Sequence, residues 1–199
     1  MTLYDIKPRF QQLLRPCLGS LYRRGVTANQ VTLLALLGSL LVGAVLWLFP
    51  VPGLFLLLPF FLFFRMALNA IDGMLAREYD QKSRLGALLN ELGDVVSDCA
   101  LYLPFALLPG AQPALVVIAV LLAALSEFCG VLAQTIGAAR GYAGPLGKSD
   151  RALLFGAYGL CVAIWPQTMS FSPWLFAIAA VLLLWTCVNR CRAALKQDV

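Results

Sequence analysis

Polar residues recur at helical spacing inside a strongly apolar part of the chain. Asn69, Asp72, Gly73 and Ala76 fall at positions i, i+3, i+4 and i+7, which places them on one face of a helix. This face presents two oxygen ligands beside two residues with almost no side chain, so a bulky or phosphorylated ligand could approach the backbone closely. An ionisable residue in the middle of a membrane costs about 2.5–3.5 kcal/mol, so its presence there indicates an ion pair or a function.

A second polar face follows on the next apolar segment. Asn90, Asp94 and Asp98 lie at i, i+4 and i+8, and Glu91 is one position further round the helix. Only a short basic link separates the two segments, so we expect them to be antiparallel neighbours. Their polar faces should then converge near the same surface of the membrane.

The chemistry of these two faces is that of a hard cation site. Oxygen ligands without sulfur or imidazole suit Mg²⁺, Mn²⁺ or Ca²⁺. Such cations, next to basic side chains, bind diphosphates and stabilise the charge that develops in phosphoryl transfer. A structural explanation stays open at this point, because small and polar residues also hold transmembrane helices together.

The composition is that of an integral membrane protein. Of 199 residues, 61% are hydrophobic and 13% are charged, whereas about a quarter are charged in soluble domains. The six cysteines lie mostly in apolar runs without a CxxC pair, so neither a disulfide framework nor a zinc site is expected. Because the chain has no histidine, proton transfer must use a carboxylate, lysine, tyrosine or water.

Six apolar segments approach the length of about 20 residues that a transmembrane helix needs. Breaks that contain proline separate them, among them FPVPG, LPGAQP and WPQTMSFSP. We therefore predict an all-α integral membrane protein with six transmembrane helices, at residues 28–49, 54–77, 85–108, 113–139, 151–167 and 173–191.

Basic residues mark one side of the membrane. The connections after the first, third and fifth segments contain no charged residue, whereas all but one of the 15 lysines and arginines fall at or beyond the other helix ends. The positive-inside rule therefore predicts that both termini are cytoplasmic. The net charge of +5 fits a membrane surface, and no nucleic-acid partner is expected.

The first residues alternate apolar and basic side chains. This pattern predicts a juxtamembrane amphipathic helix over residues 1–24, which lies on the cytoplasmic surface and faces anionic lipid. Residues 25–199 then form the six-span membrane domain. A frayed basic terminus is the alternative for the first segment.

Two further ionisable residues are predicted to lie deep in the membrane. Arg65 is twelve residues before Arg77, and Glu127 is thirteen before Arg140, so both lie about 18–20 Å from the cytoplasmic helix ends. We predict a buried ion pair between Arg65 and Glu127, which would explain how each is tolerated. Asp98 is the alternative partner of Arg65.

The segment GYAGPLGKSDR, residues 141–151, joins the fourth and fifth predicted helices on the cytoplasmic side. Together with the preceding Arg140, Lys148 and Arg151 give this region three positive charges. We interpret it as a phosphate pocket, either for a phosphorylated alcohol acceptor or for a donor diphosphate. Ordinary positive-inside residues are the alternative.

The spacing of the two polar faces resembles the signature of the CDP-alcohol phosphatidyltransferases, D-x-x-D-G-x-x-A-R-x8-G-x-x-x-D-x-x-x-D. From residue 69 to residue 94 every spacing agrees. The residues that match are Asp72, Gly73, Ala76, Arg77, Gly86 and Asp94. TANQVT, residues 27–32, is also similar to the start of the family's first span, with Ala28 in place of proline. The resemblance covers essentially the whole membrane domain.

The resemblance implies a role for each matching position. Asp72 would bind a metal ion, and Asp94 would be the general base as well as a ligand. The nucleotide would be bound by Asn29, Thr32, Gly73, Ala76, Arg77 and Gly86.

Two departures from the signature weaken the predicted metal site. Asn69 and Asn90 stand where the family has acids, so they can still offer an amide oxygen but bring no charge. Glu91 and Asp98 are placed to compensate. Three alternatives remain: a rebuilt metal site, a site with one metal, or a degenerate relative that binds lipid or nucleotide without turnover.

The resemblance implies metal-dependent transfer of a phosphatidyl or related phospho-alcohol group from a CDP-linked donor to an alcohol, with release of CMP, in phospholipid biosynthesis. The expected donor is CDP-diacylglycerol, and the expected cofactor is Mg²⁺ or Mn²⁺, although Ca²⁺ could occupy the site. We expect a homodimer in the bilayer of a bacterial inner membrane, with the active site on the cytoplasmic side. A noncatalytic member of the family is the alternative.

Overall fold

The structure is a computed structural model that describes residues 3–197, with side chains described for residues 10–197. The side-chain pattern predicted for residues 1–9 lies outside them. The α-helices of the described chain are α1 (Leu3–Arg23), α2 (Ala28–Leu48), α3 (Leu57–Glu78), α4 (Arg84–Tyr102), α5 (Pro113–Leu132), α6 (Lys148–Ile164) and α7 (Ser172–Leu195). Short 3-10 helices are η1 (Pro52–Leu56), η2 (Leu103–Leu107), η3 (Ala133–Ile136) and η4 (Pro166–Phe171). Residues 3–197 contain no strand.

The helix starts nearest the polar faces are set by side-chain caps. Thr27 begins α2 in a capping box: its hydroxyl accepts a hydrogen bond from the Gln30 amide at 3.3 Å, and the Gln30 side chain accepts one from the Thr27 amide at 2.9 Å. Ser83 caps α4 by accepting a hydrogen bond from the Gly86 amide at 2.9 Å. These caps fix where the polar faces of the two helices begin.

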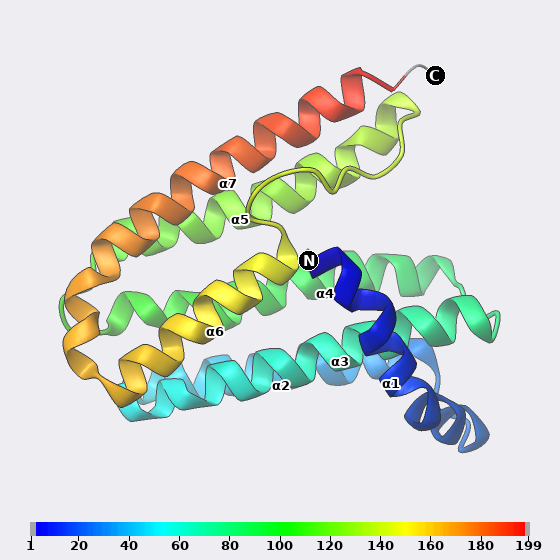
Figure 1. Ribbon diagram of the computed structural model, residues 1–199, viewed down its shortest axis with the longest axis horizontal. Coiled ribbons are helices and arrows are strands. Elements are labelled where there is room, and N and C mark those ends of the chain that lie inside the picture. The colour runs from blue at the N-terminus through cyan, green and yellow to red at the C-terminus, as the bar shows by residue number, and fades with distance from the viewer. Residues whose placement is uncertain (1–2, 198–199) are drawn as a thin grey trace.

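The helices form one elongated bundle (Figure 1). α2 packs against α3 and α4, α3 also packs against α6, and α5 pairs with α7. The α3–α4 turn and the end of α7 lie toward one side of Figure 1, and the connections α2–α3, α4–α5 and α6–α7 lie at the opposite side. The α5–α6 loop runs from the end of α5 back to the start of α6 in the middle of the molecule. α1 crosses α3, where the rings of Tyr22 and Tyr79 stack 3.9 Å apart.

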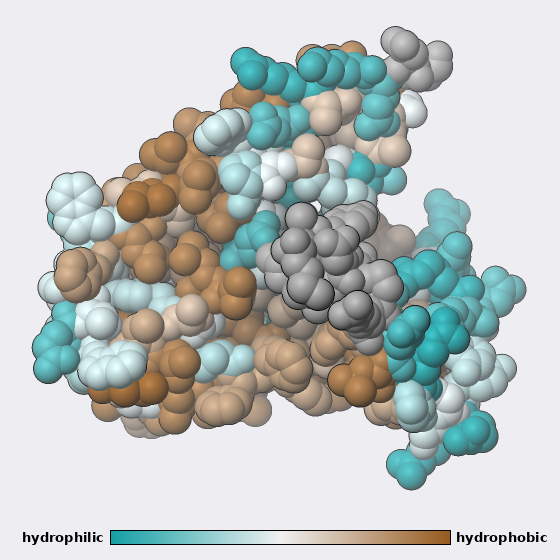
Figure 2. All heavy atoms as spheres, in the orientation of Figure 1, coloured by the Kyte–Doolittle hydropathy of each residue, from teal (hydrophilic) through white to brown (hydrophobic). Residues whose placement is uncertain are grey.

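The membrane character is visible on the surface. Helical stretches long and apolar enough to cross a membrane run from Ala28 to Leu48, from Pro52 to Glu78, from Pro113 to Ile136 and from Pro166 to Leu195. Figure 2 shows hydrophobic side chains over the body of the bundle and hydrophilic ones gathered near the α3–α4 turn and the C-terminal end of α7. The expected all-helical membrane fold is confirmed. The six-span count and the orientation stay predictions, since α4 and α6 carry charged residues.

A cluster of aromatic side chains fills the core away from the polar connections. Phe55, Tyr102, Phe105, Phe155 and Phe176 are almost fully buried and come from η1, α4, η2, α6 and α7. The rings of Phe155 and Phe176 stack 5.3 Å apart, and Phe105 lies 4.9 Å from Phe55. This packing holds the helices together at one end and leaves their other ends to carry polar side chains.

Candidate active site

A cavity of about 1050 Å³ lies between α2, α3, α4 and the start of α6. Most residues of the predicted site line it: Asn29, Thr32, Asn69, Asp72, Gly73, Ala76, Arg77, Gly86, Asn90, Asp94, Arg140 and Lys148. Glu91, Asp98 and Arg151 do not line it. The structure therefore joins the two predicted polar faces and most of the α5–α6 region in one site.

Asp72 is buried on α3 and is oriented from α2. The Thr32 hydroxyl donates a hydrogen bond to Asp72 Oδ2 at 2.9 Å and lies 3.1 Å from the carbonyl oxygen of Ala28. This contact orients the carboxylate and ties the start of α2 to the signature helix. Thr32 therefore acts on the cavity through Asp72 as well as lining it.

Gly73 allows the Arg77 side chain to fold back over its own helix. A Cβ atom placed on Gly73 would lie 3.1 Å from Arg77 Nη1 and 3.5 Å from Nη2. A side chain at Gly73 would therefore shift the guanidinium from this position. Since Ala76 also lines the cavity, this wall combines small side chains with one positive charge.

The α3–α4 turn is attached to the start of α2. Gln81 Oε1 accepts a hydrogen bond from the Ala28 amide at 2.7 Å, and Asn29 Nδ2 donates to Ser83 Oγ at 3.4 Å. A Cβ atom on Gly86 would lie 2.6 Å from Asn29 Oδ1 and 2.9 Å from Ser83 Oγ, so a larger residue would displace these two side chains. The close approach explains why the signature has glycine at this position.

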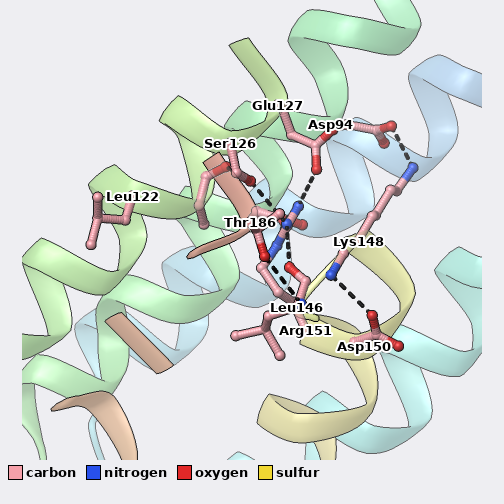
Figure 3. Close-up of polar contacts among 12 residues, drawn as sticks. Asp94, Leu122, Ser126, Glu127, Leu146, Lys148, Asp150, Arg151 and Thr186 are labelled. Carbon is pink, nitrogen blue, oxygen red and sulfur yellow. Dashed lines mark hydrogen bonds and ion pairs between the residues drawn. The ribbon is translucent and has the colours of Figure 1, made fainter. Parts of the chain in front are cut away.

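Asp94 is buried on α4 between two basic residues. Its Oδ1 lies 3.3 Å from Arg65 Nη2, and its Oδ2 makes an ion pair with Lys148 at the start of α6 (Figure 3). Arg65 also donates to the Asp94 carbonyl oxygen at 3.2 Å. The resemblance implies that Asp94 is catalytic, and the structure places its carboxylate between Arg65 of α3 and Lys148 of α6.

Asp98 lies one turn deeper than Asp94 and is fully occupied by arginines. Its Oδ1 is 2.7 Å from Arg65 Nη1, and its Oδ2 is 3.0 Å from Arg151 Nε and 2.9 Å from Arg151 Nη2. Because Asp98 does not line the cavity and both of its oxygens contact buried guanidinium groups, the structure does not support its predicted use as a replacement metal ligand.

Arg151 likewise does not take the predicted phosphate-binding position. It is 1% exposed and lies behind the cavity, where it joins Asp98 to Glu127 Oε1 at 2.7 Å. Its Nη1 also donates to Ser126 Oγ at 3.4 Å and to the Leu146 carbonyl at 3.3 Å. A phosphate would have to displace these partners (Figure 3).

The predicted ion pair between Arg65 and Glu127 is wrong, and the alternative with Asp98 is confirmed. Glu127 faces the arginines of other elements: besides Arg151, its Oε2 lies 3.2 Å from Arg140 Nη2 and 3.2 Å from Arg190 Nη1. Arg65 and Glu127 were predicted to lie at the same depth in the membrane. However, the Glu127 side chain on α5 faces α6 and α7, whereas the Arg65 side chain on α3 faces α4.

Glu91 pairs with Arg140, which precedes α6 in the chain. Glu91 Oε2 lies 2.8 Å from Arg140 Nη2, and the Arg140 guanidinium lies over the Tyr142 ring at 4.9 Å from its centroid. Burial alone would lower the pKa of Arg140, but the Glu91 charge and the Tyr142 contact outweigh it and raise that pKa above its usual value. Glu91 is therefore already neutralised by a fully charged partner.

Some residues of the site were not found from the sequence. Arg190 is 2% exposed, lines the cavity and donates to the Ser126 carbonyl, although its position near the end of the last span suggested a surface charge. A basic residue just inside a predicted span was the available signal. Gln81 gave no signal, because its role depends on the contact with α2.

The oxygen donors around the cavity can bind a divalent cation, but only two of them carry a negative charge. Asp72 and Asp94 offer carboxylates, and Asn69 and Asn90 offer amide oxygens, all lining one cavity. Among the side chains of residues 10–197, no three from His, Cys, Asp or Glu lie close enough together to share a metal ion. The set therefore suits one hard cation better than two.

Comparison with known proteins places the chain in a family. Residues 25–185 match the CDP-alcohol phosphatidyltransferase family, and the chain belongs to it. The expected class of enzyme, a CDP-alcohol phosphatidyltransferase, is thereby confirmed. Over its full length the chain is 61% identical to the inner membrane protein YnbA of Escherichia coli K12 and covers 98% of that protein. Together with its long apolar helices, this likeness shows that the chain is an integral membrane protein.

More distant relatives have the same fold. The chain is 29% identical to the phosphatidylinositol phosphate synthase of Mycobacterium tuberculosis H37Rv, over 91% of this chain and 85% of that protein. A crystal structure of the Mycobacterium tuberculosis synthase with CDP-DAG bound superposes with a TM-score of 0.75 at 23% identity, covering 93% of this chain and 94% of that one. A structure of the synthase with manganese and citrate gives 0.73 at 24% identity, with 91% and 88% covered.

The buried arginine between Asp98 and Glu127 makes a prediction about stability. Arg151→Met would leave two buried carboxylates without their shared partner, so we expect the free energy of unfolding to fall by about 3–5 kcal/mol. Denaturant unfolding of the purified protein in detergent measures this change. The matched control is Arg192→Met, an exposed arginine near the end of α7. Equal stability of the two variants would contradict the assigned role of Arg151.

Proposed function

We propose that this protein transfers a phosphatidyl group from CDP-diacylglycerol to an alcohol and releases CMP. The observation that carries the proposal is the shape of the cavity, which joins Asp72 and Asp94 to an apolar wall of α3. Leu62, Phe63 and Met66 form part of that wall, and Phe63 is 65% exposed on the surface that would face lipid. A donor with a nucleotide at one end and acyl chains at the other needs both kinds of wall.

The polar end of the cavity is suited to the nucleotide and its diphosphate. Gly73 and Ala76 leave room beside α3, and Arg77 is free to move from its position over Gly73 onto a phosphate. Asn29 and Gly86 add the closely packed wall between α2 and α4. The phosphatidylinositol phosphate synthase of Mycobacterium tuberculosis has been solved with CDP-DAG bound, which supports a donor of this type.

A divalent cation, Mg²⁺ or Mn²⁺, would be held by Asp72 and Asp94 with help from Asn69 and Asn90. When bound, such a cation neutralises diphosphate charge and stabilises the phosphoryl transition state. The family and its solved relative with manganese support this cofactor. The protein contributes the orientation of the ligands: Thr32 fixes Asp72, and Arg65 fixes Asp94.

Asp94 is the proposed general base. The acceptor hydroxyl gives its proton to the Asp94 carboxylate while its oxygen attacks the phosphorus that carries the diacylglycerol. The bond from that phosphorus to the oxygen of CMP breaks, and CMP leaves with the bonding electrons. Arg65 keeps Asp94 in place through contacts to both its carboxylate and its carbonyl oxygen.

The basic side chains in the cavity favour an acceptor alcohol that carries a negative charge. Arg140, Lys148 and Arg190 all line the cavity, and the Nε–H groups of Arg140 and Arg190 are buried without a hydrogen-bond partner among the described residues. A buried donor without a partner costs about 1–3 kcal/mol, which an acceptor phosphate would recover. We therefore favour a phosphorylated alcohol over a neutral one.

The setting in the cell completes the proposal. The charge pattern supports six transmembrane helices with both termini in the cytoplasm and α1 on the cytoplasmic surface. The Escherichia coli relative, an inner membrane protein, supports a bacterial inner membrane. The homodimer expected from the resemblance is retained as part of the proposal, and the mass of the detergent-solubilised particle tests it.

The reaction predicts CMP release from purified protein. With CDP-diacylglycerol, Mg²⁺ or Mn²⁺ and a panel of alcohols, we expect release of CMP that is faster with phosphorylated alcohols such as glycerol phosphate or inositol phosphate. Asp94→Asn should lower the rate by about 100-fold or more, because it removes the base and a ligand charge. Asp80→Asn, an exposed acid between α3 and α4 that does not line the cavity, is the control and should retain most activity.

The outcome that would contradict the reaction is a lack of CMP with every acceptor and both metals. CMP release that survives Asp94→Asn at full rate would contradict the assigned base instead.

The orientation predicts which cysteines can be labelled from outside the cell. A single cysteine introduced at Gln112, in the connection after η2, should react with a membrane-impermeant maleimide in intact cells, after the native cysteines are replaced. A cysteine at Lys82, in the α3–α4 turn, should react only after the cells are opened. The reverse pattern would contradict the proposed orientation.

A further inference from the structure

We infer that this site binds one divalent cation rather than two, and that the Lys148 ammonium supplies positive charge in place of the second cation. The inference rests on the proposed function and deepens it, because it concerns how the same site is charged. It follows from the donors that remain, from the partners of the neighbouring acids, and from the position of Lys148.

The first step is the loss of ligand charge. Of the four signature positions for acids, this chain keeps Asp72 and Asp94 and has Asn69 and Asn90 at the others. Two divalent cations about 3.5–4 Å apart repel each other strongly, and carboxylates between them normally offset that repulsion. An amide oxygen can complete a coordination shell but cannot offset the repulsion between cations.

The second step is that no nearby acid replaces the missing charge. Asp98 uses both oxygens on Arg65 and Arg151, and Glu91 lies 2.8 Å from Arg140. Neither acid lines the cavity. Recruiting Asp98 would leave two buried guanidinium groups without their partner, which costs several kcal/mol.

The third step is the lysine. Lys148 is the first residue of α6, lines the cavity and makes an ion pair with Asp94 Oδ2. Its side chain is 30% exposed, so the ammonium group reaches into the cavity from the α6 side. Figure 3 shows the side chain extending toward Asp94, away from Arg151.

The charges then balance with one cation. Arg65 also contacts Asp94, but its charge is offset by Asp98. Asp72 and Asp94 then contribute −2, one divalent cation +2 and Lys148 +1, which leaves a net charge of +1 next to the donor diphosphate. Two cations would give +3 in the same space. A lysine fixed at the start of α6 thus supplies, without a second metal ion, the charge that phosphoryl transfer requires.

The test is to count bound Mn²⁺ without turnover. Purified protein in detergent, with CDP as the nucleotide probe, is titrated with Mn²⁺ while electron paramagnetic resonance follows the free ion. We expect one Mn²⁺ per chain and no spectrum of a coupled Mn²⁺ pair. The triple variant Asn69→Asp/Asn90→Asp/Lys148→Met should bind two Mn²⁺ and show the coupled spectrum.

A single substitution separates the role of Lys148 from a structural one. Lys148→Met removes a positive charge next to the cation, so the wild-type Mn²⁺ site should become tighter by about tenfold. A merely structural role would leave the affinity unchanged or weaken it. Glu91→Gln and the exposed Lys196→Met are the controls, and both should leave the number and affinity of bound Mn²⁺ unchanged.

Two Mn²⁺ bound to the wild-type chain, or none, would overturn the inference. A weaker site after Glu91→Gln would show that Glu91 supplies the missing charge and would overturn it as well. One bound Mn²⁺ without CMP release in the activity assay would instead refute the proposed reaction and leave the one-cation site intact, so the two failures are distinguishable.

Discussion

Asp98 sits between two arginines from different helices, and the arrangement of the site depends on this contact. Arg65 of α3 and Arg151 of α6 each take one of its oxygens, and each then reaches a second acid, Asp94 and Glu127 respectively. The result is an alternating series of buried charges that joins α3, α4, α5 and α6. In an apolar environment each member is stable only while its neighbours are present, so the series fixes the rotation of these helices about their axes.

The side chains with proposed roles in the reaction lie at the ends of this series. At one end, Asp94 contacts Arg65 and Lys148 and lines the cavity together with Asp72. At the other end, Glu127 contacts Arg140 and Arg190, the two arginines whose buried Nε–H groups have no partner among the described residues. The same network that lets the membrane domain carry charge therefore brings the proposed donor site and the proposed acceptor site to one cavity.

The sequence predicts well those parts of the site that depend on residue spacing along one helix. It predicts poorly the contacts that depend on how the helices are rotated against one another. Turn residues and apolar length located the helices, and the spacing from Asn69 to Asp94 located the cavity wall, because both depend on positions along one helix. The pairing of Arg65 did not follow from depth, since Arg65 and Asp98 meet only through the packing of α3 against α4. Arg151 was predicted to bind phosphate for the same reason, because only its contacts with Asp98 of α4 and Glu127 of α5 show that its side chain is buried behind the cavity.

The most direct measurement is a crystal structure grown with CDP-diacylglycerol and Mn²⁺, with the metal located by anomalous scattering. The account predicts one Mn²⁺ between Asp72 and Asp94, the diphosphate beside it within reach of Arg77, and an acyl chain along the apolar wall of α3. A nucleotide bound outside this cavity, or a second Mn²⁺ held by Asn69 and Asn90, would contradict it.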